Sequence, residues 1–367
     1  MYPTSIQLNC VFVINSLCTS RKNLNQILSV DNSSVLDSVM RVLSDWTSLV
    51  TLSNRGQHGV SVIQIQNWCT LPRQNLILLC KLCVDEAGCK QMVKRGLVLK
   101  LKGIWYTCHA ETDRALVIEA LARMARFNRP ADKLCYEGFL TCLVEGFCDE
   151  EHREHILEVV FNLGKKHLPQ MLDAGLLQKV VFSFGEKTFD KKLVPAVLSI
   201  LASFSANDQV RDLLLENEGQ AYTLVLDTAF LTSDVSLLQS CISIISKMST
   251  SVVSCQLLES NMLLLVAYID KLLKTGPDSV LLHGLMQLQD YLQVPFLLKA
   301  FLEHHVQRVV EILCWPPHTA SVQYLARQVL QLLTGVPGRH DRVTDQMVHD
   351  VTKQTSDDSK DDRIKEL

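Results

Sequence analysis

The first candidate for chemistry is a pair of cysteines at a spacing that zinc sites use. Cys80 and Cys83 form a Cys-x-x-Cys pattern, and Cys89 follows nearby. A structural zinc site needs a second matching pair of ligands within reach, whereas these cysteines lie within a leucine-rich run. Because a buried free cysteine behaves as a small apolar side chain, we interpret the motif as core packing.

A second candidate is a pair of histidines among glutamates. His152 and His155 are three residues apart, beside Glu150, Glu151 and Glu154. This spacing differs from His-Glu-x-x-His, which places two ligands one turn apart with a catalytic glutamate. Acidic residues favour the start of a helix, so we interpret residues 150–155 as a solvated helix start. Since no phosphate-binding loop, nucleophile elbow or kinase motif is present either, the sequence predicts no enzyme, no bound metal and no cofactor.

The charge distribution gives the clearest functional signal. Between Lys90 and Lys133 there are ten basic and four acidic residues, a local charge of +6 in a chain whose net charge is −3. Such a segment attracts an acidic or phosphorylated peptide, or the phosphates of a nucleic acid; an ordinary solvated face is the alternative interpretation. The candidate partner-binding residues are Lys90, Lys94, Arg95, Arg123, Arg126, Arg129 and Asn162.

The elements that position these residues are marked by turn-like residues at nearly fixed spacing. These are Gly96, Gly138, Gly175, Gly219, Asn261 and His305, separated by 42, 37, 44, 42 and 44 residues. Between them, apolar residues recur on one helical stripe, as in Val117, Ala120, Leu121, Met124 and Ala125. The order of long helix, short helix, turn and second helix recurs along the chain. A period of about 40–47 residues with helical patterning is typical of stacked helical repeats.

This order resembles the armadillo/HEAT family of α-solenoids over roughly residues 5–335, and residues 79–98 carry the resemblance best. That stretch has a leucine-rich helix, a polar turn, a short helix ending near Gly96 and a second apolar helix. The resemblance implies an all-α fold, a right-handed α-solenoid of armadillo-like repeats. Such a pattern specifies architecture and says little about function.

The resemblance also bears on how a partner is bound. Peptide-binding members of the importin and catenin type present a ladder of asparagines from successive long helices, which bond the peptide backbone. The matching region here holds Lys81, Met124, Asn162, Ser203, Lys247 and Gln289. Only Asn162 fits the ladder, so we expect side-chain pockets, helix-in-groove docking or edge contacts instead.

The predicted organisation is one repeat domain, residues 1–335, followed by a tail. Residues 53–68, around a polar loop, form an irregular insertion that is either a binding element or a passive loop. The chain begins almost directly in an apolar helix, which indicates a piece of a longer solenoid or an N-terminus that packs on a partner. Residues 336–367 hold eight acidic and six basic residues with almost no large apolar ones, which predicts a disordered tail.

The cysteine content and the apolar runs of the chain indicate its cellular compartment. The 13 cysteines are odd in number and lie mostly at apolar helix positions, which favours a reducing cytosol or nucleus over a disulfide framework. No apolar run reaches the length of about 18 residues that a membrane span needs. We therefore expect no membrane insertion.

Two functions remain open. The first is a non-enzymatic protein–protein interaction scaffold or adaptor, which binds an extended or helical acidic segment along the concave face, anchored by Arg123 and Arg126. The second is a chromosome- or nucleic-acid-associated scaffold that uses the basic patch of residues 90–133. Salt dependence distinguishes them, because binding to phosphates weakens steeply with salt.

Overall fold

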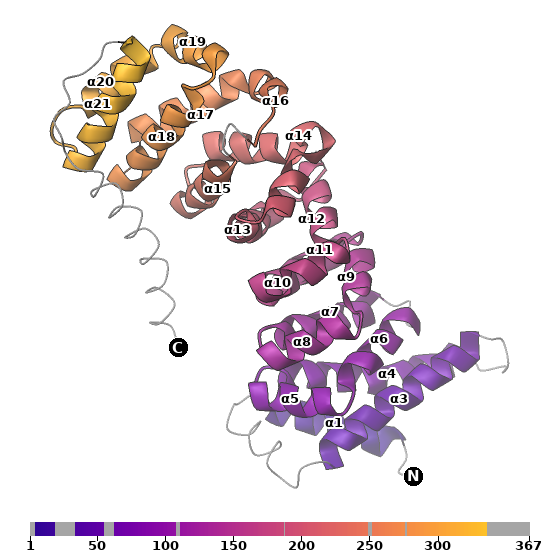
Figure 1. Ribbon diagram of the computed structural model, residues 1–367. Coiled ribbons are helices and arrows are strands. Elements are labelled where there is room, and N and C mark those ends of the chain that lie inside the picture. Colours follow the sequence, from indigo (N-terminus) through magenta and orange to yellow (C-terminus); the bar gives the residue numbers. More distant parts are fainter. Residues whose placement is uncertain are drawn as a thin grey trace. The chain divides into compact units, whose positions relative to one another are not determined.

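The computed structural model describes residues 4–18, 34–54, 62–107, 111–186, 188–248, 252–275 and 277–335. These residues form helices and turns, with no β-strand among them (Figure 1). Their contacts divide the chain into two compact units, one ending at Phe204 and one beginning at Ser205. The single repeat domain over residues 1–335 stays a prediction. The predicted disordered tail, residues 336–367, lies outside the described residues.

The first unit repeats the predicted order of long helix, short helix and second helix. Its elements are α1 (Thr4–Leu17), α3 (Ser34–Asn54), α4 (Val62–Leu82), α5 (Glu86–Lys94), α6 (Leu97–Thr107), α7 (Glu111–Ala125), α8 (Asn128–Tyr136), α9 (Leu140–Gly146), α10 (Glu150–Leu163), η1 (Lys165–His167), α11 (Leu168–Asp173), α12 (Leu176–Gly185), η2 (Lys191–Leu193) and α13 (Val194–Phe204).

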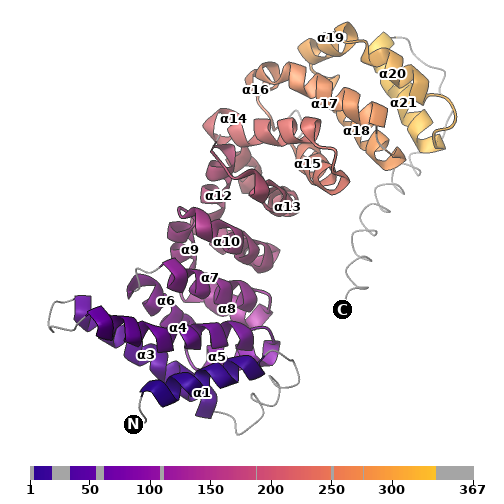
Figure 2. The ribbon, with the colours of Figure 1, turned by 180° about the vertical axis from the view of Figure 1, so that it is seen from behind.

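Equivalent helices of successive repeats lie beside one another in this unit. The helices α4, α7, α10 and α13 pack in sequence order and form what we call the long-helix row. Both views show α7 and α10 side by side (Figures 1 and 2). The short helices α5 and α8 also pack together, and an ion pair of 2.6 Å between Asp132 and Lys166 joins α8 to η1. We call α5, α8 and η1 the short-helix row.

The second unit continues the same pattern. Its helices are α14 (Asp208–Leu231), α15 (Val235–Lys247), α16 (Cys255–Ser260), α17 (Met262–Thr275), α18 (Asp278–Tyr291), α19 (Pro295–Glu303), α20 (Val306–Leu313) and α21 (Ala320–Thr334). Helix α14 is interrupted at residues 216–219, where Asn217, Glu218 and Gly219 adopt left-handed backbone angles. The predicted turn at Gly219 therefore separates two helical segments of α14.

All six predicted joints lie between helical segments. Five of them have a positive φ, which is +77° at Gly96 and +58° at His305, a backbone conformation that glycine adopts most readily. Asn261 is the exception, with a φ of −103°. Its side-chain Nδ2 donates a 3.0 Å hydrogen bond to the carbonyl oxygen of Leu257. Asn261 thus closes α16 with its side chain rather than with a left-handed backbone.

The apolar stripes form the core, as predicted. On α7, Val117, Ala120, Leu121, Met124 and Ala125 are each at most 2% exposed. Burial of such side chains is the main stabilising contribution, at about 25 cal/mol per Å² of apolar surface. The long helices are therefore held by packing against their neighbours in the row.

The N-terminal region differs from the prediction. Helices α3 and α4 have 21 residues each, so residues 62–68 of the predicted insertion are the first residues of α4. Pro72 lies inside α4, although proline usually ends or kinks a helix, so the local pattern does not indicate one long helix here. Residues 55–61 of the predicted insertion lie outside the described residues.

Candidate protein-binding surface

The cysteine motif occupies the core. Cys80, Cys83 and Cys89 are all buried, and the Sγ of Cys89 donates to the carbonyl oxygen of Cys83 at 3.1 Å. Burial raises the pKa of the Cys80 thiol to about 12, which disfavours the reactive thiolate. The predicted core packing of Cys80 and Cys83 is confirmed. Within the described ranges, no group of His, Cys, Asp or Glu side chains is arranged to hold a metal ion.

His152 corrects the interpretation of residues 150–155 as a solvated helix start. The side chain is 1% exposed, and its ring lies 6.1 Å from the ring of Trp105 between centroids. Neither ring nitrogen has a hydrogen-bond partner among the described residues. Desolvation lowers the pKa of His152, against the opposing effect of Asp149 and Glu151. The sequence signal was available, because His152 precedes Ile156 by one turn and extends the buried stripe of α10.

Replacing His152 with leucine is expected to raise the free energy of unfolding by about 1 kcal/mol at pH 7, because an unpaired buried polar ring is removed. The pKa of His152 is lowered in the folded state, so the unfolded chain binds the proton more readily. The contribution of neutral His152 to the free energy of unfolding is therefore fully present above the ordinary histidine pKa of about 6.5. This contribution is lost as the pH falls below that value. Urea denaturation at pH 7.5 and at pH 5.5 measures both effects.

The matched control is His155→Leu, on the same helix at a half-exposed position. Part of the acid sensitivity should remain in every variant, because burial also lowers the pKa of His167 and His283. If His152→Leu leaves the difference between the two pH values as large as in the parent chain, His152 is not the group responsible.

Half of the ten cations in the predicted basic patch lie within 4 Å of a carboxylate of the first unit. Four of the seven candidate residues form ion pairs, namely Lys90 with Glu86, Arg95 with Asp37, Arg123 with Glu119, and Arg126 with Glu158. Lys94 and Arg129 are exposed and form no ion pair with any described residue. The structure therefore separates the candidates into four paired cations and two cations without an ion pair. The sequence did not show this division, because a partner carboxylate can lie as far as 58 residues away.

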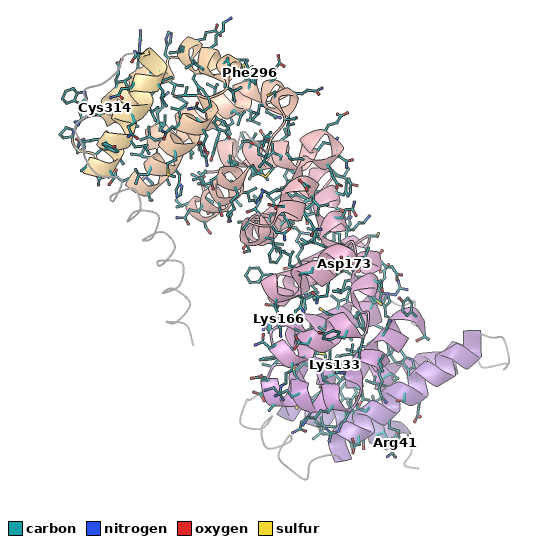
Figure 3. All side chains as sticks on the ribbon, viewed as in Figure 1. Arg41, Lys133, Lys166, Asp173, Phe296 and Cys314 are labelled. Carbon is teal, nitrogen blue, oxygen red and sulfur yellow. The ribbon has the colours of Figure 1, made fainter. Side chains whose placement is uncertain are left out.

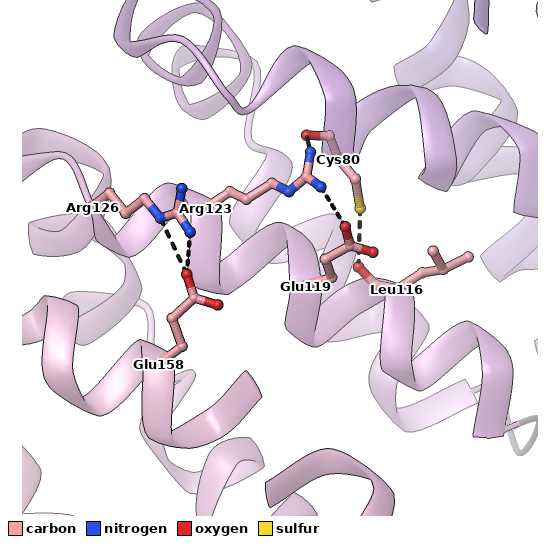
Figure 4. Close-up of polar contacts among 6 residues, drawn as sticks. All are labelled: Cys80, Leu116, Glu119, Arg123, Arg126 and Glu158. Carbon is pink, nitrogen blue, oxygen red and sulfur yellow. Dashed lines mark hydrogen bonds and ion pairs between the residues drawn. The ribbon is translucent and has the colours of Figure 1, made fainter. Parts of the chain in front are cut away.

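Arg123 connects two helices of the long-helix row. From α7 it donates hydrogen bonds to the carboxylate of Glu119 and to the backbone carbonyl of Cys80 on α4, while Arg126 reaches Glu158 on α10 (Figure 4). Arg123 lies in the last turn of α7, and Arg126 follows three residues later, in the turn just after the helix. Their guanidinium groups hold neighbouring helices together, so much of their hydrogen-bonding capacity is used within the fold.

The same bracing recurs at the positions compared with the asparagine ladder. The Nζ of Lys81 donates to the carbonyl of Asn15 on α1 at 2.6 Å, and the Nδ2 of Asn162 donates to the carbonyl of Ala122 on α7 at 3.4 Å. Arg123, rather than Met124, occupies the equivalent place on α7, since Met124 is fully buried. A shift of one residue turns a helical side chain by about 100°, which explains this error in the sequence comparison.

The feature of this row that sequence reasoning missed is Phe161. Its side chain is 49% exposed on α10, although the sequence placed it in an apolar helix without distinguishing it from the core. Glu158 lies on the same side of α10, three residues before it, and Asn162 is the next residue along the helix. The corresponding positions on α7 and α13 are Ala122 and Ala202. In the described part of the row, Phe161 is an exposed aromatic ring close to the Arg126–Glu158 pair. Its counterpart on α7, Ala122, is 1% exposed, whereas Ala202 on α13 is half-buried.

This arrangement is suited to protein binding. An apolar anchor within a polar rim is the usual anatomy of a protein–protein interface, and aromatic residues are frequent among its energetic hot spots. The polar groups here are paired with one another, which favours a rigid surface. None of the described helices has the length and apolarity required to cross a membrane.

Comparison with known proteins supports the fold. No protein-family model matches the sequence, and no curated protein matches it either. The crystal structure of an engineered protein is similar with a TM-score of 0.56 and 13% identity, over 92% of this chain and 87% of that chain. An armadillo repeat protein computationally designed for modular peptide recognition is similar with a TM-score of 0.50 and 15% identity, over 65% of this chain and 98% of that chain. At these identities the likeness establishes architecture alone, and the architecture of this chain is that of an armadillo-type α-solenoid.

Proposed function

We propose that this protein is a non-enzymatic scaffold that binds a segment of a partner protein across the long-helix row of the first unit. The proposal rests on Phe161, whose large ring is 49% exposed. The apolar stripes of the described helices in this row are buried. The likeness to a designed peptide-recognition protein adds support from architecture.

An apolar side chain of the partner would pack on Phe161 and against the half-buried Ala202 on α13. Arg126 retains a side chain that is 54% exposed, and a guanidinium has five N–H donors, of which its contacts with Glu158 use two. A carboxylate of the partner can therefore approach Arg126 without breaking the existing pair. This geometry supports the expectation of a partner segment with acidic character.

We infer protein rather than nucleic acid as the partner of this row. The cations Lys90, Arg95, Arg123 and Arg126 already face carboxylates, which reduces the positive charge offered to phosphates. For localisation we propose the cytosol or the nucleus, because every cysteine whose side chain the structure describes is a free thiol.

Phe161→Ser is expected to weaken partner binding at least tenfold while leaving stability nearly unchanged, because hot-spot aromatics contribute about 2 kcal/mol or more to binding. A displayed peptide library selected on the purified full-length chain would supply the ligand. Fluorescence anisotropy of the selected peptide then measures its affinity for each variant.

Phe12→Ser is the matched control, since Phe12 is 44% exposed on α1 of the same unit. The control should bind the selected peptide as tightly as the parent chain. Equal binding by Phe161→Ser and Phe12→Ser would show that the long-helix row is not the binding surface. A selection that enriches no peptide would also contradict the proposal.

A further inference from the structure

A second surface lies on the short-helix row. On α8, Arg129, Lys133 and Tyr136 are spaced at i, i+4 and i+7 and lie on one side of the helix. Tyr136 is 79% exposed, the largest fraction among the exposed large apolar side chains in the described part of the chain. Tyrosine and arginine are both enriched at protein–protein interfaces relative to the rest of the surface. It differs from Phe161, whose neighbours are paired charges.

The charges around Tyr136 are largely uncompensated. Arg129 on α8 and Lys94 on α5 form no ion pair with any residue in the described ranges. Lys133 is 55% exposed and reaches Glu137 only at 3.8 Å. The acid within this stripe, Asp132, is already engaged, at 2.6 Å by Lys166 and at 3.1 Å by His167. Figure 3 labels Lys133 and Lys166 close together on the first unit.

Lys94 lies beside this stripe because of the repeat. It occupies the place on α5 that Tyr136 occupies on α8, 42 residues later, and α5 packs against α8. Lys94, Arg129, Lys133 and Tyr136 together form what we call the tyrosine surface. It combines three exposed cations with one exposed ring.

The end of α8 that carries Tyr136 is fixed in place. The Nζ of Lys102 on α6 donates a 3.0 Å hydrogen bond to the carbonyl oxygen of Glu137, the residue that caps α8. The following turn at Gly138 has a φ of +71°, and a Cβ there would lie 3.1 Å from the Nζ of Lys102. A surface held in this way loses little conformational entropy when a ligand binds.

We propose that the tyrosine surface binds an acidic protein segment that carries an aromatic side chain. The carboxylates of the segment would face Lys94, Arg129 and Lys133, and its ring would pack on Tyr136. Charge complementarity favours an acidic occupant, because Asp132 is already engaged by Lys166 and His167, and Glu137 lies 3.8 Å from Lys133. Tyrosine and arginine are the residue types that most often dominate binding energy at such interfaces.

Two labelled peptides and one oligonucleotide test this proposal on the full-length chain. The probes are fluorescein-labelled Glu-Glu-Glu-Phe-Glu-Glu-Glu, the same peptide with serine in place of phenylalanine, and a single-stranded DNA of about 12 nucleotides. At low salt we expect the phenylalanine peptide to bind most tightly. Lys94→Glu combined with Arg129→Glu should weaken its binding at least tenfold, and Tyr136→Ser should remove most of the advantage over the serine peptide.

Two control variants match these changes. Lys299→Glu alters a lysine that is 78% exposed and 3.8 Å from Glu303 on α19, a short helix of the second unit, and Tyr106→Ser alters a tyrosine that is 50% exposed on α6. Neither control should change peptide binding, and Phe161→Ser should not change it either, which keeps this proposal separate from the one for the long-helix row. Peptide binding that survives the charge reversal overturns the proposal, as does binding of the DNA without binding of either peptide.

Discussion

Leu121→Asp is expected to lower the free energy of unfolding by roughly 4–5 kcal/mol and to leave the first unit partly unfolded at room temperature. Leu121 is 1% exposed on α7, in the middle of the long-helix row. Burying an unpaired carboxylate costs several kcal/mol in addition to the lost packing. Circular dichroism at 222 nm during urea denaturation measures the effect.

Leu99→Asp provides the control for this substitution, because Leu99 is 58% exposed on α6 of the same unit. The same chemical change there is expected to alter stability by about 0.5 kcal/mol or less. A Leu121→Asp variant as stable as Leu99→Asp would show that the helical register of α7 is wrong.

Gly146→Ala is the second change with a large expected effect, a destabilisation of about 1–3 kcal/mol. Alanine favours a helix over glycine by about 1 kcal/mol, so local propensity alone predicts the opposite sign. A Cβ at position 146 would lie 2.7 Å from the Cη2 of Trp105 and 3.3 Å from the Cδ1 of Ile156. Trp105 is 3% exposed, and the guanidinium of Arg114 stacks 5.1 Å from its ring, so the ring has little room to move.

A double-mutant cycle isolates this contact. Trp105→Leu removes the ring that a Cβ at position 146 would strike, so Gly146→Ala should cost less in that background than in the parent chain. Thermal or urea unfolding of the four proteins gives the coupling. Equal costs of Gly146→Ala in both backgrounds would rule out the close approach of α9 to Trp105.

The repeat architecture was predictable because it depends on local signals. A positive φ at Gly96, Gly138 and Gly175 needs only the residue type and its place after an apolar run. The buried stripe of α7 follows from the helical period. Asn261 was placed correctly as a joint, yet its side-chain cap could not be distinguished from a left-handed turn, because asparagine serves in either role.

The candidate site was less predictable because charge pairing depends on distant residues. Arg95 meets Asp37, 58 positions earlier, and Arg126 meets Glu158, 32 positions later. The composition of residues 90–133 counts Arg95 and Arg126 as free charges, because both partner carboxylates lie outside that segment. Only the stacking of helices shows that some cations are neutralised while Lys94 and Arg129 have no ionic partner among the described residues.

Two further differences follow from small rotations around a helix. His152 and Phe161 both lie on α10, yet His152 is 1% and Phe161 49% exposed. The helical stripe that contains Ile156 and Leu163 includes position 152, one turn before Ile156, and leaves position 161 outside it. Polarity suggested the reverse assignment, and packing within the row decided it.

Photo-crosslinking of the selected peptide tests the central claim most directly. The peptide would carry benzoylphenylalanine in place of its apolar anchor, and adducts on the full-length chain would be mapped by mass spectrometry. We predict adducts on α10 around Phe161 and on the adjoining segments of α7 and α13, and their loss in Phe161→Ser but not in Phe12→Ser. Adducts that map to the second unit, or to α6 and α9, would contradict the proposal that the long-helix row is the binding surface.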